Sequence, residues 1–242
     1  MVGIVVENLV AGYGNVSVLH DVSIDVADKQ TVALLGTNGN GKSTLLSCIA
    51  GLIRPTKGQI ILVDGEVRTD LTSLSPKEIV GAGVSMVPEG RRLFPLLTVE
   101  ENLVLGAYRP EARVVRGETL EYCFALFPRL AERRTQQAGS MSGGEQQMLA
   151  VARALMSVPK LLLIDEPSVG LAPILVQQMI EKIGELSKSK GLTVLMAEQN
   201  FNQAIRIADK GYIIVHGEIA FASKDAVDLR ENEMIKSYYL GG

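Results

Sequence analysis

Short apolar runs separated by glycines and charged residues are spread along the chain, and most of them are typical of β-strands. Residues 22–26 alternate apolar and polar side chains, which predicts a strand with one buried face. Residues 31–35 are apolar without a break, which predicts a strand buried on both faces. Further strands are predicted at residues 4–6, 60–63, 84–87, 161–164 and 193–197, and a hairpin at 211–221 that turns at His216-Gly217.

Helical spacing begins at residues 43–50, which end at Gly51, and then dominates the stretch from 98 to 155. Thr98 and Glu101 form the capping-box pattern at a helix start. Residues 174–187 are helical between two predicted strands, which makes a βαβ unit and therefore predicts a parallel sheet. The chain is thus expected to have an α/β fold with an inserted helical part.

The composition limits the class of protein. The 242 residues are 47% hydrophobic, enough for one α/β domain with an inserted subdomain. Mean hydropathy is +0.20, yet no apolar run reaches the roughly 18 residues of a spanning helix. We therefore assign the apolar excess to buried strands or to a face that contacts a partner. A net charge of −3 gives no reason to expect nucleic-acid binding.

Neither the cysteines nor the N-terminus indicates secretion. Cys48 and Cys123 lie far apart and outside any CxxC pattern, which argues against zinc or a disulfide and suits a reducing cytosol. Residues 1–8 lack a basic region followed by a long apolar run, so no signal peptide is expected. His20 and His216 fall in strand and turn contexts, and both are interpreted as structural.

A glycine-rich loop between a predicted strand and a predicted helix matches the Walker A pattern, Gly36-x-x-x-x-Gly41-Lys42-Ser43. Glycines let backbone N–H groups converge on a phosphate, and the following helix directs its dipole at the same anion. Lys42 is expected to bind the β- and γ-phosphates, and Ser43 to ligate Mg²⁺. An ordinary turn that matches by chance is the alternative. The residues expected to bind ATP here are Asn38, Gly39, Asn40, Gly41, Lys42, Ser43 and Thr44.

The apolar strand at 161–164 ends in two acids, Asp165 and Glu166. Strand ends are where open α/β sheets place their sites. We expect Asp165 to hold Mg²⁺ and Glu166 to orient or deprotonate the attacking water. A solvated acidic turn is the alternative.

Ser142-Gly143-Gly144-Glu145 opens another helix and predicts a second anion site distant from the first. Such an arrangement fits a protein whose site is completed by another subunit. The same residues also match a plain capping box, Ser-x-x-Glu. Both interpretations can hold, because Glu145 bonded back to Ser142 would turn its charge away from an incoming phosphate.

Together these motifs resemble the nucleotide-binding subunits of ATP-binding-cassette (ABC) transporters over essentially the whole chain. Met141 to Glu145 is similar to the family signature, and Tyr13 matches the aromatic residue that stacks on adenine. Residues 168–171 match the loop after the Asp165-Glu166 pair, although Gly170 stands where Ala or Leu usually precedes an Asp.

The resemblance implies a P-loop NTPase with a RecA-like parallel core sheet, an N-terminal antiparallel β subdomain and an inserted helical subdomain. Residues 1–88 and 157–242 would form the core part of a single domain, and 89–156 the helical part. It further implies a head-to-tail dimer in which ATP lies between one subunit's Lys42 and the other's Ser142, Gly143 and Gly144. Two transmembrane permease subunits would hold the dimer on the cytoplasmic face of the membrane.

Two positions depart from the family pattern. Glu89 stands where a glutamine usually contacts Mg²⁺; a carboxylate can also ligate the metal, and Arg91 or Arg92 would offset its charge. Gln199 stands where a histidine usually contacts the γ-phosphate, and an amide can donate one hydrogen bond but cannot carry a proton. Both departures resemble the second ATPase subunit of branched-chain amino-acid importers. We expect slow hydrolysis by the isolated chain.

Other classes explain less of the sequence. An ABC-type ATPase without a transporter usually has coiled-coil arms or a second cassette, and this chain has neither. A GTPase or small-molecule kinase would leave the signature helix unexplained, and no Asn-Lys-x-Asp motif occurs. Glu166 argues against a regulatory cassette that binds ATP without hydrolysing it. The unusual residues Glu89 and Gln199 keep that alternative open.

Overall fold

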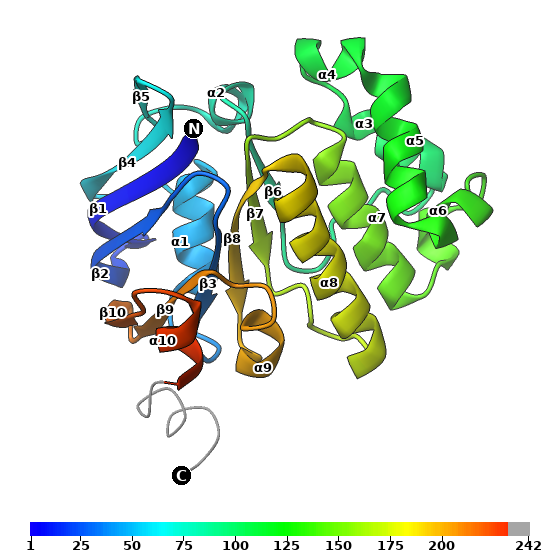
Figure 1. Cartoon of the computed structure of the whole chain (residues 1–242). Helices are drawn as coiled ribbons and strands as arrows, with labels where there is room; N and C mark the ends of the chain where they lie inside the picture. The colour runs from blue at the N-terminus through cyan, green and yellow to red at the C-terminus, as the bar shows by residue number, and fades with distance from the viewer. Residues whose placement is uncertain (232–242) are drawn as a thin grey trace.

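The computed structural model describes residues 1–231, which form two β-sheets and a group of helices (Figure 1). A four-stranded antiparallel sheet has the order β2-β1-β4-β5, and a six-stranded sheet has the order β10-β9-β3-β8-β7-β6. The strands are β1 (Val2–Tyr13), β2 (Val16–Val26), β3 (Thr31–Leu35), β4 (Lys57–Asp64), β5 (Val67–Asp70), β6 (Val84–Val87), β7 (Leu161–Asp165), β8 (Thr193–Glu198), β9 (Lys210–Val215) and β10 (Glu218–Ala222).

The larger sheet is parallel from β9 through β6, and β10 alone runs antiparallel, against β9. The carboxyl ends of β3, β6, β7 and β8 therefore meet at one edge. In register, Leu35 of β3 lies beside Glu198 of β8, and Ala197 of β8 beside Asp165 of β7. This edge carries the predicted phosphate loop and the acidic pair, as expected for a site in an open α/β sheet.

In Figure 1, α1 lies between the two sheets, whereas α3 to α8 lie on the other side of the larger sheet. The helices are α1 (Lys42–Ile49), α2 (Pro76–Gly81), α3 (Val99–Gly106), α4 (Pro110–Val114), α5 (Arg116–Leu126), α6 (Pro128–Glu132), the 3₁₀ turn η1 (Ala138–Ser140), α7 (Gly143–Leu155), α8 (Pro173–Lys190), α9 (Phe201–Ala204) and α10 (Ala226–Glu231). The division at 88/89 and 156/157 stays a prediction.

Alternate residues of the central strands enter two separate apolar clusters. Leu34 of β3 and Leu163 of β7 pack with α1 and the antiparallel sheet. Leu35 of β3 and Ile164 of β7 pack with the helices on the opposite face. Since successive side chains of a strand point to opposite faces, an uninterrupted apolar run is what a sheet covered on both sides requires.

The predicted strands and the hairpin at His216-Gly217 are confirmed, as are the main helices and the capping box of α3. Within residues 1–231, the elements β5, α2, α9 and α10 have no counterpart in the predictions, whereas α4 and α6 lie inside the stretch 98–155 that is predicted as helical without separate bounds. All six have four to six residues and bury few side chains. Within residues 1–231, no helix combines the length and apolar character needed to cross a bilayer.

Candidate active site

The predicted phosphate loop, the aromatic residue and two acids surround one cavity of about 460 Å³ at the carboxyl edge of the larger sheet. Most of the residues expected to bind ATP contribute to its wall, together with Glu89 and Glu166. The lining residues are Tyr13, Val18, Asn38, Gly39, Gly41, Lys42, Ser43, Thr44, Glu89 and Glu166. The structure thus brings together side chains from β1, the α1 loop, the segment after β6 and the end of β7.

Gly41 shows why this loop needs glycine. Its φ is 100°, a conformation that residues with a side chain rarely adopt, and it immediately precedes α1. A β-carbon added there would lie 2.7 Å from a methyl group of Leu19. The conformation exposes the amide groups at the start of α1 toward the cavity, which is the geometry of an anion site.

Lys42 lies at the centre of the cradle with only 3% of its surface exposed. Its Nζ donates to the carbonyl oxygens of Gly36 at 2.8 Å and Thr37 at 3.1 Å. It also forms an ion pair of 2.9 Å with Oε1 of Glu166. An ammonium group held in this way is a fixed positive charge for phosphate oxygens.

Ser43 and Asp165 form the pair expected to hold a cation. Oγ of Ser43 donates to Oδ1 of Asp165 at 3.0 Å. Burial raises the pKa of Asp165 to about 6, and the charges of Glu166 and Glu89 add to this effect. A buried carboxylate beside other acids favours a cation, and Mg²⁺ typically takes one or two protein oxygens plus phosphate oxygens. Among the described residues, no cluster of three His, Cys, Asp or Glu side chains could hold a metal alone.

Glu166 has a strained backbone. Its φ is 45°, which is uncommon for a residue with a side chain, and its amide donates to the carbonyl oxygen of Ala197 at 3.0 Å. Such conformations persist where the surroundings enforce them, and they cluster at functional sites. The turn directs the Glu166 carboxylate into the cavity, whereas the exposed Glu89 approaches from the segment after β6.

Asn40 and Gln199 do not line the cavity. The amide nitrogen of the Asn40 side chain donates to Thr37, and its oxygen accepts from the backbone of His216, so this side chain ties the loop to the β9–β10 hairpin. Gln199 is exposed at the end of β8. Tyr13 stands at the rim with 57% of its surface exposed, open to a stacking partner.

The signature residues Ser142, Gly143 and Gly144 also lie outside the cavity, at the N-terminus of α7. The expected capping box is present. Ser142 Oγ accepts from the Glu145 amide at 3.4 Å, and Glu145 accepts from the Ser142 amide at 3.0 Å. Glu145 also forms an ion pair of 2.8 Å with Arg133. These bonds lower the pKa of Glu145 against the opposing effect of burial, and they engage its charge within the subunit.

Glu198 is a buried carboxylate with no role in the sequence predictions. It accepts hydrogen bonds from the amide and hydroxyl of Ser168 at 3.0 and 2.9 Å, and from the amides of Gln199 and Asn200 at 3.1 and 3.2 Å. Burial raises its pKa, and these donors oppose the rise. Glu198 therefore fixes the loop after Glu166 against the segment that carries Gln199. The sequence does contain a signal for Glu198, because it is an acid at the end of an apolar strand, as Asp165 is.

Arg91 and Arg92 were expected to offset the charge of Glu89. Within residues 1–231 neither forms an ion pair with it. Nη1 of Arg91 instead donates to Oε1 of Gln146 on α7 at 3.2 Å, and Arg92 lines a separate groove.

Comparison with known proteins agrees with this geometry. The family model described as "ABC transporter" matches residues 19–169. This chain belongs to the ABC transporter family. The match spans the phosphate loop, the signature helix and the acidic pair, and ABC ATPases couple hydrolysis of ATP to transport. The chain is thus an ATP-binding, ATP-hydrolysing ABC subunit.

Its relatives include a high-affinity branched-chain amino acid transport ATP-binding protein, BraG, of Pseudomonas aeruginosa. The two are 47% identical over 95% of this chain and 96% of BraG. A probable branched-chain amino acid transport ATP-binding protein, LivF, of Archaeoglobus fulgidus is 37% identical over 96% and 95%.

Solved ABC cassettes have the same fold. A nucleotide-free ATP-binding cassette of an ABC transporter superposes with a TM-score of 0.84 at 26% identity, over the full length of both chains. A dimeric cassette in a post-hydrolysis state with ADP and phosphate gives 0.76 at 25% identity, over 91% of this chain and 98% of that one.

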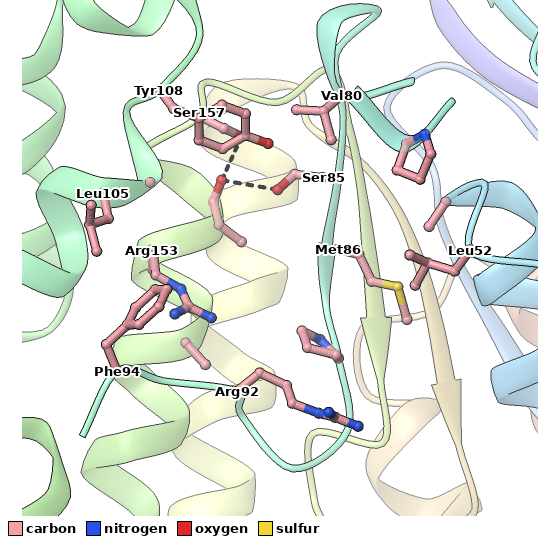
Figure 2. Close-up of a pocket in the computed structure, with 16 residues that line it drawn as sticks. Leu52, Val80, Ser85, Met86, Arg92, Phe94, Leu105, Tyr108, Arg153 and Ser157 are labelled. Carbon is pink, nitrogen blue, oxygen red and sulfur yellow. Dashed lines mark hydrogen bonds between the residues drawn. The ribbon is translucent and has the colours of Figure 1, made fainter. Parts of the chain in front are cut away.

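The ABC subunit has a second cavity, of about 520 Å³, between its helices α3 and α7 and the strand β6 (Figure 2). Four of its apolar side chains are strongly exposed: Leu52, Phe94, Leu105 and Tyr108. The Arg153 guanidinium lies over the Phe94 ring, 5.6 Å from its centroid. We call this cavity the α3–α7 groove.

Proposed function

We propose that this ABC subunit drives the import of branched-chain amino acids. BraG supports this most, because the two proteins are 47% identical over nearly their whole lengths and BraG is named for that transport. Glu89 and Gln199 also support this proposal, since the segments that contain them resemble those of the second ATPase subunit of such importers. An ATPase of the same type without a transporter is the alternative that the experiment below must exclude.

In the proposed reaction, the cradle at Lys42 binds the β- and γ-phosphates of ATP, and Tyr13 stacks on adenine. Mg²⁺ would be held by Ser43, Asp165 and phosphate oxygens, with Glu89 as a further ligand. The metal supplies charge neutralisation at the transferred phosphoryl group. Glu166 orients the attacking water and accepts its proton, and Gln199 donates a hydrogen bond to the γ-phosphate.

The functional unit is proposed to be a head-to-tail pair of cassettes. Ser142, Gly143 and Gly144 of one subunit would cover the ATP held by the Lys42 cradle of the other. The separation of these residues from the cradle supports this, because they lie at the N-terminus of α7, outside the cavity that the cradle lines. The second subunit is a copy of this chain or a related cassette.

Two permease subunits would dock on the α3–α7 groove and hold the ATPases at the inner face of the membrane. The groove exposes large apolar side chains on a chain of high mean hydropathy, and a contiguous apolar patch of this kind is typical of a protein interface. The groove would then be the partner-contacting face that is one of the two explanations of the apolar excess, the other being buried strands.

Uptake of radiolabelled leucine, isoleucine and valine tests the proposal. In cells lacking the gene, the parental chain should restore uptake, and Glu166→Gln and Lys42→Ala should not. Labelled proline serves as the unrelated substrate. Unchanged branched-chain uptake in the deletion strain, together with a tagged chain that retrieves no permease, would support the non-transport alternative.

A further inference from the structure

Arg91 lies in a tight bend between β6 and α3. Gly90, Arg91 and Arg92 have φ values of 74°, 65° and 48°, so three consecutive residues are left-handed. This conformation costs roughly 1 kcal/mol for each residue with a side chain. The bend sends the two arginines to different places. Arg92 lines the α3–α7 groove, whereas the Arg91 side chain reaches the N-terminal turn of α7.

The Arg91 guanidinium occupies the space that a side chain on Gly143 would need. A β-carbon on Gly143 would lie 3.2 Å from Nη2 and 3.4 Å from Nη1 of Arg91, and one on Gly170 would lie 3.6 Å from Nη2. The guanidinium is therefore beside the signature residue and the loop after Glu166 at once. Gln146 anchors it through a single hydrogen bond, and Arg153 fixes its backbone by donating to the Arg91 carbonyl at 3.3 Å.

The positive charge of Arg91 is not neutralised by a neighbouring carboxylate. Within residues 1–231 no carboxylate forms an ion pair with it. The one acid of the first turn of α7, Glu145, is engaged by Ser142 and Arg133. The N-terminus of a helix carries a partial positive charge of its own. A fixed guanidinium added to it makes an anion site for a ligand with several negative charges.

We propose that Arg91 is a phosphate-binding residue that acts on the other subunit, where its guanidinium joins the amides of Gly143 and Gly144 on the terminal phosphate of ATP. This rests on the proposed pairing of cassettes. Within residues 1–231 the guanidinium uses Nη1 for its hydrogen bond to Gln146, so Nε and Nη2 are available as donors, and its planar shape matches two phosphate oxygens. Because Gln146 and Arg153 hold it in position, little side-chain freedom is lost on binding.

The test uses the transporter co-purified through a tagged copy of this chain, with ATPase activity measured against ATP concentration. Arg91→Ala should raise the KM for ATP about tenfold, and Arg91→Lys should recover part of the loss because it keeps the charge but not the planar fork. Arg113→Ala, which removes an exposed arginine of α4, should match the parent. An unchanged KM for Arg91→Ala would overturn the assignment and leave the proposed function intact.

Measurements on the isolated chain distinguish a role of Arg91 at the other subunit's ATP from a role within its own subunit. Arg91→Ala should change neither its melting temperature nor its affinity for a fluorescent ATP analogue, because its own cradle is elsewhere. A fivefold weaker affinity in the isolated chain would show that Arg91 acts within its own subunit and overturn the proposal. Inorganic phosphate should stabilise the isolated parental chain more than Arg91→Ala, because the guanidinium and the α7 N-terminus belong to one subunit, and equal stabilisation of the two would overturn the proposal. Failure of the tagged chain to retrieve any permease or second cassette would overturn the proposed function, and this inference with it.

Discussion

At the scale of single residues, the most consequential contact is the ion pair between Lys42 and Glu166. Both groups are buried, and in the proposed reaction each has another partner: a phosphate for Lys42 and a water molecule for Glu166. Removing one member of a buried pair leaves the other charge without compensation. A substitution at either residue therefore alters binding as well as chemistry.

Glu166→Gln should lower the rate of phosphate release by roughly 10²–10⁴-fold, because the amide cannot accept a proton. Affinity for ATP should be kept or increased, since a neutral side chain competes less for Lys42. Steady-state ATPase assays and nucleotide titration measure the two effects. Glu218→Gln, on the exposed β10, is the control. A parental rate for Glu166→Gln would exclude Glu166 as the proton acceptor.

Asp165 gives a prediction of pH dependence. Its pKa is raised from 3.8 to about 6, so the folded chain binds this proton more tightly than the unfolded chain. The free energy of unfolding should therefore fall as the pH rises from about 4 to about 6. In Mg²⁺-free buffer at pH 7.5, Asp165→Asn should be more stable than the parent by on the order of 2 kcal/mol. Below pH 4 the gain should vanish, and a gain independent of pH in denaturant titrations would contradict this.

At the scale of elements, three helices begin with the same device. In α2, α3 and α7 a Ser or Thr accepts from the amide three residues on, and a Glu at that position bonds back. Only the box at α7 lies in the proposed interface between cassettes. The chain thus contains its own controls for separating helix capping from phosphate binding.

Ser142→Ala and Ser75→Ala should each cost about 1 kcal/mol of stability, because each removes one cap hydrogen bond. Only Ser142→Ala should also weaken ATP-driven association of subunits, measured by sedimentation in a Glu166→Gln background. Equal effects of both variants on association would mean that Ser142 acts through helix stability alone.

The sequence predicts the long elements well, and the reason is periodicity. The strands β3, β7 and β8 are apolar on both faces, and α7 and α8 span several turns, so their patterns are unambiguous. In contrast, β5 buries none of its residues fully, and α2, α4 and α6 each bury only one. Elements of this kind depend on tertiary contacts that no local pattern records.

For the site, motif spacing predicts most of the residues that line the cavity, because the loop and the strand ends are local features. Val18 lines it without having been predicted, whereas Asn40, Asp165 and Gln199 do not line it. Motif spacing does not predict how Asn40, Arg91 and Glu198 are used. Each makes its contacts with a segment distant in sequence: the β9–β10 hairpin, α7 and the loop at Ser168. Their roles follow from packing rather than from residue type.

At the scale of the whole molecule, the segment after β6 connects the two cavities. Glu89 lines the cavity at the phosphate loop, while Arg92 and Phe94 line the α3–α7 groove. A partner in the groove would therefore contact the same short segment that lines the phosphate-loop cavity.

Phe94→Ala should weaken retention of the permease on a tagged chain at least tenfold, since it removes an exposed aromatic anchor and the partner of Arg153. Val227→Ala, at an exposed apolar residue of α10, is the matched control. Quantitative co-purification measures both variants, and equal permease yields would place docking elsewhere.

The alternation of β3 and β7 between two apolar clusters has a consequence for how this subunit tolerates change. Neighbouring residues in one strand belong to opposite halves of the interior, and the same strands end beside the phosphate loop. A conservative exchange such as Leu163→Val removes packing on one face of β7, and we expect it to disturb the position of Asp165 and Glu166 at the end of that strand. Genetic drift in the interior is therefore constrained by catalysis as well as by stability, even at residues that never contact ATP.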